Sequence, residues 1–538
     1  MNEILPNQAF TTSTTDSSPN DEELFRFTRG PRQADVIFIG EAWGDEEAAC
    51  SLPFIGSSGK ELDRILHDAG LSNARILYTN VAHYRLPFKS GGYDFTQLMY
   101  PNKEKDAETW NGAKVNAQLR EYISLLLRLI NRVRPKLLIA AGNWPLFILT
   151  EHAELKTTDG FKLPTGIAKW RGSQTYSRLL QDGKRLPVLP IIHPAAILRE
   201  WGWRQITVHD LRTRAGRFLK GERTWDENPK HKRTHKPTWA DIQSFTRNTY
   251  SQLEHGPTWI SVDLETFKRK WISVVGLATE KEDLVVPLFL RGTDDKLQNY
   301  FPLWQEQTFF RDLKTILEHP NARIIGQNFI YDTEWLWRYY NIKALCAFDT
   351  MVAHHLLFPG TPKRLDYLAS LYCDHFIYWK DESRDWDQLP EDAERYWLYN
   401  AKDIRATYEV GIVLRAAIEK SGLSPLLEER MEQWILSREM SLRGSLFNSS
   451  LQKEMKLELL EEASSLQQWL LAAIPESARF ASSGKPWYDS PTQTALILYT
   501  ILGIRPVLHK KTKRPTTDDA ALAEISERPE CQWLEPLL

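Results

Sequence analysis

Two carboxylates stand two residues apart in a strand-like stretch near the middle of the sequence. Asp263 and Glu265 lie in the apolar run 259–266, and a second β-rich run, residues 271–277, follows closely. Residues two apart on a strand point to the same face, so the two carboxylates are expected side by side. Because neighbouring carboxylates repel each other, a divalent cation is their usual partner. The pair alone is more often a solvated strand end, so the interpretation depends on the residues downstream.

Two further acids are expected on helices, each with a polar residue four positions before it. Asn328 and Asp332 belong to a segment that opens a helix, and Tyr399 and Asp403 belong to a long helix over residues 391–420. A spacing of four residues predicts that the members of each pair share one helix face.

Four acids and a tyrosine in this order resemble the DEDDy proofreading exonucleases. The neighbouring segments Phe348-Asp-Thr-Met351 and Leu365-Asp-Tyr-Leu-Ala369 extend the resemblance to the exonuclease domain of family A DNA polymerases, over residues 246–425. The resemblance implies an RNase H-like fold, a mixed sheet with helices, and 3′→5′ hydrolysis of DNA ends. An inactive domain of the same fold is the alternative.

The same resemblance implies two divalent metal ions, Mg²⁺ or Mn²⁺, roughly 4 Å apart. Asp263, Glu265 and Asp403 would hold the first ion, and Asp263 and Asp332 would hold the second. Tyr399 would orient the attacking water, and Asn328 is expected to contact DNA.

Composition limits the class of protein. A chain of 538 residues is expected to form several domains, and 68 Lys and Arg against 70 Asp and Glu leave a net charge of −2. Any DNA contact must therefore come from local basic patches. The four cysteines are scattered without a C-x-x-C pair, which argues against a disulfide framework and favours a reducing compartment. Without a signal peptide or a long apolar run, we expect a soluble protein of a bacterial or phage-infected cytoplasm, with no membrane contact.

The N-terminal part alternates strands with helices. Residues 1–27 are expected to be a disordered tail, and strands are predicted at 35–39, 76–81, 135–142 and 187–192. This alternation predicts an α/β fold with a parallel sheet, whose sites form beyond the carboxyl ends of the strands. Glu41, Asn80 and His193 all fall there.

Residues 28–222 resemble the uracil-DNA glycosylase superfamily, closest to its family-4 branch. The segments Gly40-Glu-Ala-Trp-Gly44, Pro53-Phe-Ile-Gly56 and His193-Pro194 carry the resemblance. It implies an α/β/α domain with a pocket for a flipped uracil base, because the glycosidic bond is inaccessible inside a stacked duplex. Phe54 would stack on that base and Asn80 would read its polar edge. Glu41 and His193 would assist water attack and stabilise the departing uracil anion.

The sequence departs from that branch in three places. Trp43 stands where the family motif has proline, and Tyr84 stands where a cluster-binding cysteine is expected. No iron–sulfur cluster is therefore expected. Residues 88–114 form an insertion after the second strand. A glycosylase-like fold retained for DNA or protein contact is the alternative to an active glycosylase.

Residues 223–245 are expected to be a basic linker that is solvated or touches phosphates. Residues 426–538 resemble the segment that leads into the thumb of family A polymerases, with helices and a basic loop at Lys510, Lys511 and Lys513. Such a loop suits contacts to a duplex backbone, although a solvated charge run reads the same. The sequence stops within this partial thumb, and no palm or fingers motif precedes the stop. A separate polypeptide with palm and fingers, or a longer natural sequence, would supply them.

The sequence therefore predicts the N-terminal portion of a family A DNA polymerase of the type found in large tailed phages. Its expected activity is proofreading 3′→5′ exonuclease on single-stranded ends and primer–template DNA, with a glycosylase-like domain that binds or excises uracil. A DNA-repair uracil glycosylase and a non-catalytic DNA-binding subunit of a split polymerase are the two alternatives. Uracil release would favour the first, and DNA binding without either activity would favour the second.

Overall fold

The structure is a computed structural model that divides into two compact units, Met1–Leu442 and Arg443–Leu538. It describes residues 21–89, 92–104, 107–181, 183–226, 231–291, 296–383, 393–474, 476, 479, 484–509 and 513–537. Within these ranges, no helix combines the length and the apolar character needed to cross a membrane.

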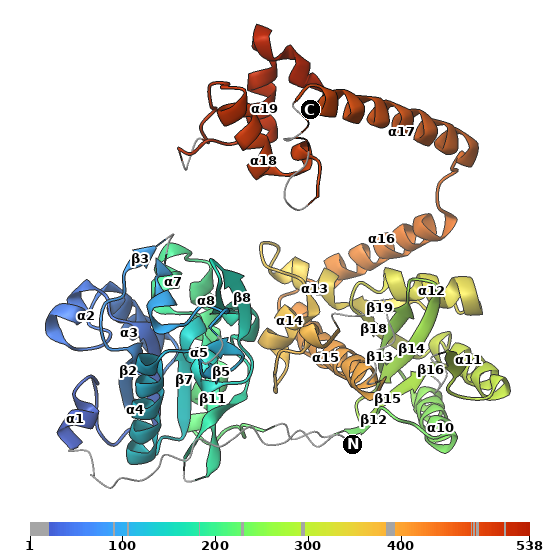
Figure 1. The fold of residues 1–538 in the computed structure, drawn as a ribbon. Helices are drawn as coiled ribbons and strands as arrows, with labels where there is room; N and C mark the ends of the chain where they lie inside the picture. The colour runs from blue at the N-terminus through green and yellow to red at the C-terminus, as the bar shows by residue number, and fades with distance from the viewer. Residues whose placement is uncertain are drawn as a thin grey trace. The chain divides into compact units, whose positions relative to one another are not determined.

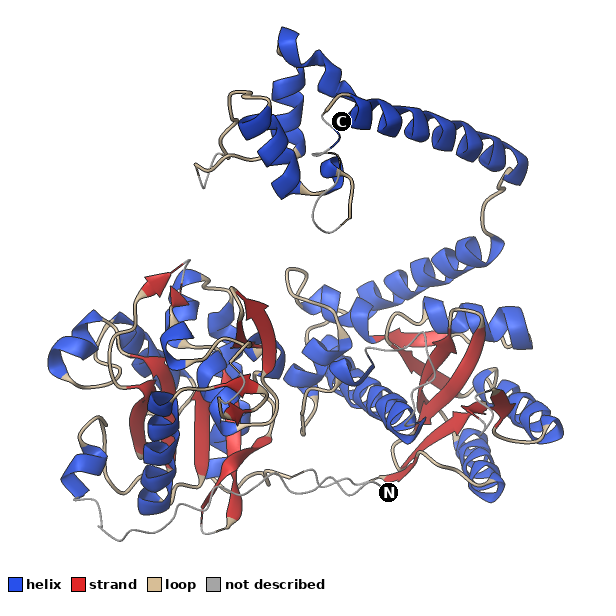
Figure 2. Ribbon diagram, in the orientation of Figure 1, coloured by secondary structure: helices blue, strands red, loops and turns tan. Residues whose placement is uncertain are grey.

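The first sheet of unit 1 has five strands in the order β10-β11-β7-β1-β2. Figure 1 labels β2, β7 and β11 of this sheet, and Figure 2 draws the strands in red. The four strands predicted from the sequence are confirmed and run parallel, whereas β10 was not predicted and pairs antiparallel with β11 at the edge. Their bounds are β1 (Val36–Ala42), β2 (Ile76–Ala82), β7 (Leu137–Ala141), β10 (Thr175–Gln181) and β11 (Lys184–Ile191).

Helices cover both faces of this sheet because its central strands are apolar on both sides. On β1, Ile37 and Ile39 belong to a core shared with α4 (Ala117–Val133) and α5 (Asn143–Leu149). The alternate residues Val36 and Phe38 belong to a second core with α3 (Ser57–Asp68), α7 (Pro194–Arg199) and α8 (Trp203–Asp210). The α/β/α domain expected from the sequence is therefore confirmed.

The second sheet of unit 1 is mixed, as expected, with the order β12-β15-β14-β13-β18-β19. β13, β14 and β15 form an antiparallel meander, and β18 and β19 add parallel to β13. The bounds are β12 (Lys232–Thr234), β13 (Thr258–Phe267), β14 (Trp271–Ala278), β15 (Glu282–Pro287), β18 (Ala322–Gly326) and β19 (Cys346–Asp349).

One long helix, α15 (Ala393–Lys420), packs across this sheet, and it confirms the helix predicted over 391–420 in the part that the structure describes. Gly276 on β14 lets the helix approach, because a Cβ at that position would overlap the side chains of Asn400 and Ile404. The core also includes α10 (Trp239–His255), α11 (Leu303–Leu317), α12 (Ile330–Tyr340), α13 (Thr350–Leu357) and α14 (Leu365–Tyr372).

Two segments expected to lack regular structure differ from the prediction. Asp21–Phe25 forms helix α1 instead of a disordered tail, because Leu24 and Phe25 are buried and Asp21 pairs with Arg132. The expected basic linker contains β12, which extends the second sheet beside β15, and the start of α10. Residues 1–20 of the expected tail lie outside the described residues.

Helices also dominate the C-terminal region. Helix α16 (Ser424–Arg443) packs Leu427, Met431 and Trp434 into the core of the second sheet. Unit 2 has its own core, built around Leu470, Trp487 and Ile525. Its helices are α17 (Ser449–Ala472), α18 (Pro491–Ala495) with a π-helical extension to Ile501, and α19 (Asp519–Ser526).

Candidate functional site

Three acidic side chains meet where α15 packs against β13. Asp263 and Glu265 come from β13 and Asp403 from α15, and each offers one carboxylate oxygen within 4.8 Å of the other two. A cluster of carboxylate oxygens at this spacing suits a divalent cation that prefers hard ligands. The cluster is thus a candidate metal centre built from one strand and a helix distant in sequence.

Hydrogen bonds tie the helix to the strand at this point. Ser261 Oγ on β13 donates to the carbonyl of Ile404 at 2.7 Å, and Asn400 Nδ2 on α15 donates to Asp263 Oδ2 at 2.8 Å. The helix that carries Asp403 therefore also orients Asp263.

The fourth acid, Asp332, lies in the first turn of α12 beside the same strand. Its Oδ1 accepts the backbone N–H of Leu264 at 2.8 Å, between the two acids of β13. Asn328 does not share a helix face with Asp332, which corrects the prediction from their spacing. It precedes α12 with a left-handed backbone (φ 56°), a conformation that asparagine tolerates, and its side chain is exposed.

Burial disfavours the ionised forms of Asp263, Glu265 and Asp332. Burial, followed by the charge of Asp403, raises the pKa of Asp263 to about 7. Burial and the neighbouring carboxylate of Asp263 raise the pKa of Glu265 and of Asp332 above their usual values. A bound cation would stabilise the ionised forms of these carboxyl groups, so the site is suited to bind positive charge.

A lysine that the sequence analysis did not predict supplies positive charge beside these acids. Lys380 Nζ donates to both carboxylate oxygens of Asp403, at 2.9 and 2.7 Å, and to Tyr399 Oη at 2.8 Å. Trp379 Nε1 donates to Asp403 Oδ1 at 2.6 Å. Burial opposes the charged form of Lys380, but Asp403 and Tyr399 outweigh it and raise the lysine's pKa. Tyr399 and Asp403 thus face one partner, as their spacing on one helix predicts.

A second group of predicted residues gathers at the carboxyl ends of β1 and β2. The side chains of Phe54 and Asn80 both lie against Gly40, so close that a Cβ at position 40 would overlap each of them. The Phe54 ring lies 6.1 Å from the His193 ring, and Phe54 adopts a left-handed backbone (φ 57°) that few residues of its size tolerate. Asn80 Oδ1 is buried and has no hydrogen-bond partner within the described part of the chain.

Glu41 and His193 are each held by a backbone amide. Glu41 Oε1 accepts the N–H of Asn143 at 2.8 Å at the start of α5, while burial raises the pKa of the carboxyl group. His193 Nδ1 accepts the N–H of Ala195 at 3.1 Å, which leaves the ring proton of the neutral form on Nε2. Burial, with Arg199 nearby, lowers the pKa of His193 to about 4.

The two departures from the family motif lie in an aromatic cluster. Trp43 packs edge-on against Phe27 at 5.5 Å, and His83 lies 5.1 Å from Phe27 between ring centroids. The ring centroid of Tyr84 lies 6.3 Å from that of Tyr122.

Of the predicted basic loop in the C-terminal region, Lys513 is exposed, whereas Lys510 and Lys511 lie outside the described residues.

Comparisons with known proteins match these two regions separately. Residues 27–212 match the model of the uracil DNA glycosylase superfamily, and residues 237–419 match a model described as 3′-5′ exonuclease. The type-4 uracil-DNA glycosylase of Archaeoglobus fulgidus is 25% identical over 169 residues, which are 31% of this chain and 69% of that protein. The DNA polymerase I of Borreliella burgdorferi is 24% identical over 280 residues, which are 51% of this chain and 29% of that protein.

A solved structure, the POL domain of Pol1 from M. smegmatis in complex with DNA primer-template and dNTP, aligns at 16% identity with a TM-score of 0.37. The alignment covers 57% of this chain and 47% of that structure's chain. Taken by region, the matches establish that this chain carries a uracil-DNA glycosylase-like domain followed by a 3′–5′ exonuclease domain similar to that of DNA polymerase I.

Proposed function

We propose that the exonuclease domain hydrolyses the terminal phosphodiester bond at DNA 3′ ends and proofreads for a polymerase of family A. The observation that supports this most directly is the cluster of Asp263, Glu265 and Asp403, joined by Tyr399 through Lys380. The similarity to DNA polymerase I over 51% of this chain agrees with it. Single-stranded and primer–template DNA are the proposed partners, and a polypeptide with palm and fingers would complete the polymerase.

The residues present fit a pair of divalent cations, since Asp263, Glu265 and Asp403 cluster and Asp332 is bonded to the N–H of Leu264 between the two acids of β13. The pKa values of Asp263, Glu265 and Asp332 are raised, mainly by burial. Asp263, Glu265 and Asp403 would hold one ion, and Asp263 and Asp332 the other. The ions, when bound, would supply an activated water and offset negative charge on the leaving oxygen.

The chain's own residues position the reaction. Burial raises the pKa of Tyr399, so its hydroxyl stays protonated and can orient the attacking water by a hydrogen bond. Lys380, held between Tyr399 and Asp403, fixes that hydroxyl relative to the carboxylate. The water adds to the terminal phosphorus and the bond to the 3′ oxygen of the penultimate nucleotide breaks. One nucleoside monophosphate leaves, and the shortened strand takes the proton.

The test is degradation of a 5′-labelled single strand by the purified chain with Mg²⁺ or Mn²⁺. The strand should shorten from its 3′ end, and Asp263→Ala should reduce the rate by at least about a thousandfold. Asp312→Ala is the matched control, because this half-exposed acid lies on α11, outside the cluster. Equal degradation by Asp263→Ala and the wild type would refute the assignment.

The N-terminal domain supports a second candidate function, recognition of uracil in DNA. The supporting observation is the buried Asn80 Oδ1 beside Phe54, which has no hydrogen-bond partner among the residues that the structure describes and so can accept a hydrogen bond from a base edge. We propose that the pocket binds uracil-containing single strands while excision is slow or absent, because Trp43 replaces the motif's proline.

Phe54→Ala should weaken binding to a uracil-containing strand by about tenfold, since a base–aromatic stack contributes about 1–3 kcal/mol. Phe161→Ala, a half-buried ring on β9 (Phe161–Thr165), controls for general loss of packing. Fluorescence anisotropy with uracil- and thymine-containing strands measures the effect. Equal affinity of the wild type for both strands would show that the pocket reads no base.

A further inference from the structure

The segment that carries Trp379 and Lys380 packs its apolar side chains into the core of its own domain, while its backbone is hydrogen-bonded to the other domain of unit 1. We call residues 373–381 the strap; they follow α14 and lead into a short 3₁₀ turn that begins at Lys380. The strap forms no strand, yet Cys373, Phe376, Tyr378 and Trp379 are buried. Its conformation therefore depends on the groups that cover it.

Three hydrogen bonds join the backbone of the strap to the glycosylase-like domain just before β10. The N–H of Gln174 donates to the carbonyl of Phe376 at 2.8 Å, and Gln174 Oε1 accepts the N–H of Phe376 at 3.4 Å. Ser173 Oγ accepts the N–H of Tyr378 at 3.2 Å. Ser173 and Gln174 are both buried, so these bonds are shielded from water.

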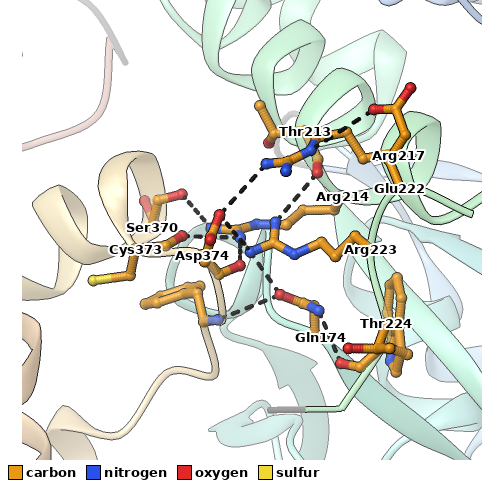
Figure 3. A network of polar contacts seen from close by, with 12 residues as sticks. Gln174, Thr213, Arg214, Arg217, Glu222, Arg223, Thr224, Ser370, Cys373 and Asp374 are labelled. Atoms are coloured by element: carbon orange, nitrogen blue, oxygen red, sulfur yellow. Dashed lines mark hydrogen bonds and ion pairs between the residues drawn. The ribbon is translucent and has the colours of Figure 1, made fainter. Parts of the chain in front are cut away.

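A buried arginine fixes the start of the strap (Figure 3). Arg214 donates to the carbonyls of Ser370 and Cys373, each at 3.0 Å, and also to the carbonyl of Asp374. Burial, with the charge of Arg223 nearby, lowers the pKa of Arg214 to about 10. If the strap moved away, a buried guanidinium would lose these acceptors, which is costly.

A second buried arginine acts beside it. Arg171 forms a two-bond ion pair with Asp210, at 2.6 Å for each bond, and donates to Ser370 Oγ at 3.1 Å. At the far end of the strap, Lys169 Nζ lies 3.2 Å from Asp381 Oδ1. The glycosylase-like domain thus contacts the strap at its start, its middle and its end.

The strap in turn holds the candidate metal centre. Trp379 donates to Asp403 at 2.6 Å, and Lys380 bridges Asp403 and Tyr399. Hydrogen bonds to a metal-binding carboxylate set its orientation, and their loss typically weakens metal binding by about 10–100-fold.

We propose that the glycosylase-like domain is a positioning element of the exonuclease site, acting through the strap on Trp379 and, through Trp379, on Asp403. This inference rests on the proposed exonuclease function. Trp379 and Ser173 are positioning residues, since neither is expected to touch the DNA or a metal ion. The alternative is that the same contacts merely join two domains without affecting the site.

The test compares two pairs of matched variants in the full chain. Trp379→Phe removes the indole N–H that reaches Asp403, while Trp434→Phe changes a buried indole whose N–H has no partner among the described residues. Ser173→Ala removes the hydroxyl bonded to Tyr378 of the strap, while Ser177→Ala removes an equally buried hydroxyl bonded to Leu179 within the glycosylase-like domain.

Two quantities are measured: the affinity for Mn²⁺, from the electron paramagnetic resonance signal of the free ion, and kcat and KM on a single strand. Trp379→Phe should weaken Mn²⁺ binding about tenfold and lower kcat with little change in KM. Ser173→Ala should weaken it about threefold and add nothing further in the Trp379→Phe background, because both act on one carboxylate. The control variants should match the wild type in both quantities.

The two hypotheses fail differently. A wild type that binds Mn²⁺ but never degrades DNA contradicts the exonuclease function, while the Mn²⁺ affinities still decide the role of the strap. Equal Mn²⁺ affinity of Ser173→Ala and Ser177→Ala overturns the positioning role of the glycosylase-like domain. Additive effects of Ser173→Ala and Trp379→Phe overturn the route through Trp379.

Discussion

At the scale of single residues, burial has opposite consequences at the two sites. It raises the pKa of the acid Asp263 and lowers that of the base His193, because in each case the neutral form is favoured away from water. In the acidic cluster, a bound cation would offset the cost of keeping the buried carboxylates ionised. Beside Phe54 it leaves an uncharged imidazole that can donate a hydrogen bond without carrying charge.

The neutral state of His193 is open to direct measurement. Its pKa is lowered from 6.5 to about 4, so the stability contributed by the neutral ring is fully present above pH 6.5 and is lost as the pH falls through 4. The ring's NMR signal should stay that of neutral imidazole from about pH 8 to about pH 5.5. His193→Gln identifies the signal. A midpoint near 6.5 would contradict the burial that the structure shows.

At the scale of elements, the acidic cluster depends on how closely α15 lies on the sheet. The helix supplies Asp403 and Tyr399, and its Asn400 orients Asp263 of β13. Gly276 on the neighbouring strand leaves the space that this approach requires. A strand and a helix that are separated by more than a hundred residues therefore form one site only through this contact.

Gly276→Ala should disturb the site without altering any of its acids. The added methyl group would overlap Asn400 and Ile404, and such overpacking costs about 1–3 kcal/mol. We expect a lower unfolding midpoint in urea and weaker Mn²⁺ binding. Gly360→Ala is the matched control, since a Cβ there meets no atom within 4 Å. An unchanged midpoint and unchanged Mn²⁺ binding for Gly276→Ala would show that α15 does not require this close approach.

At the scale of the whole molecule, the structure divides into two compact units that one short segment connects. Unit 1 ends at Leu442, and unit 2 surrounds its own core of Leu470, Trp487 and Ile525. Between α16 and α17, Leu446 is fully exposed and Phe447 is 69% exposed. Large apolar side chains at an exposed connection are accessible to a protease with apolar specificity.

Limited digestion with chymotrypsin should therefore cut first after Leu446 or Phe447. The two products should persist, because each keeps a complete core, and mass spectrometry should identify both ends. A variant with serine at both positions, Leu446→Ser and Phe447→Ser, should survive intact under the same conditions. First cuts inside α16 or α17 would indicate that the helices, and not the connection between them, are the accessible part.

Local patterns in the sequence determined the elements of both sites. Alternating burial on β13 puts Asp263 and Glu265 on one side, and the helical period puts Tyr399 and Asp403 on another shared face. Both relations follow from the backbone geometry of a few consecutive residues, which is the same in any strand or helix. The strands that carry Glu41 and Asn80 were predictable for the same reason.

Tertiary structure alone decided the relations between distant segments. Asn328 does not lie on the expected helix face, because its left-handed backbone places it before α12. Asp21–Phe25 forms a helix because the side chains of Leu24 and Phe25 are buried. Trp379 and Lys380 carry no periodic signal, since the strap forms no strand and its backbone is hydrogen-bonded to Arg214, Gln174 and Ser173 of the other domain. Sequence periodicity reports the structure that short-range bonds impose, whereas Asp403 is bonded by a segment without periodicity, whose backbone is in turn bonded to residues 202 and 205 positions away.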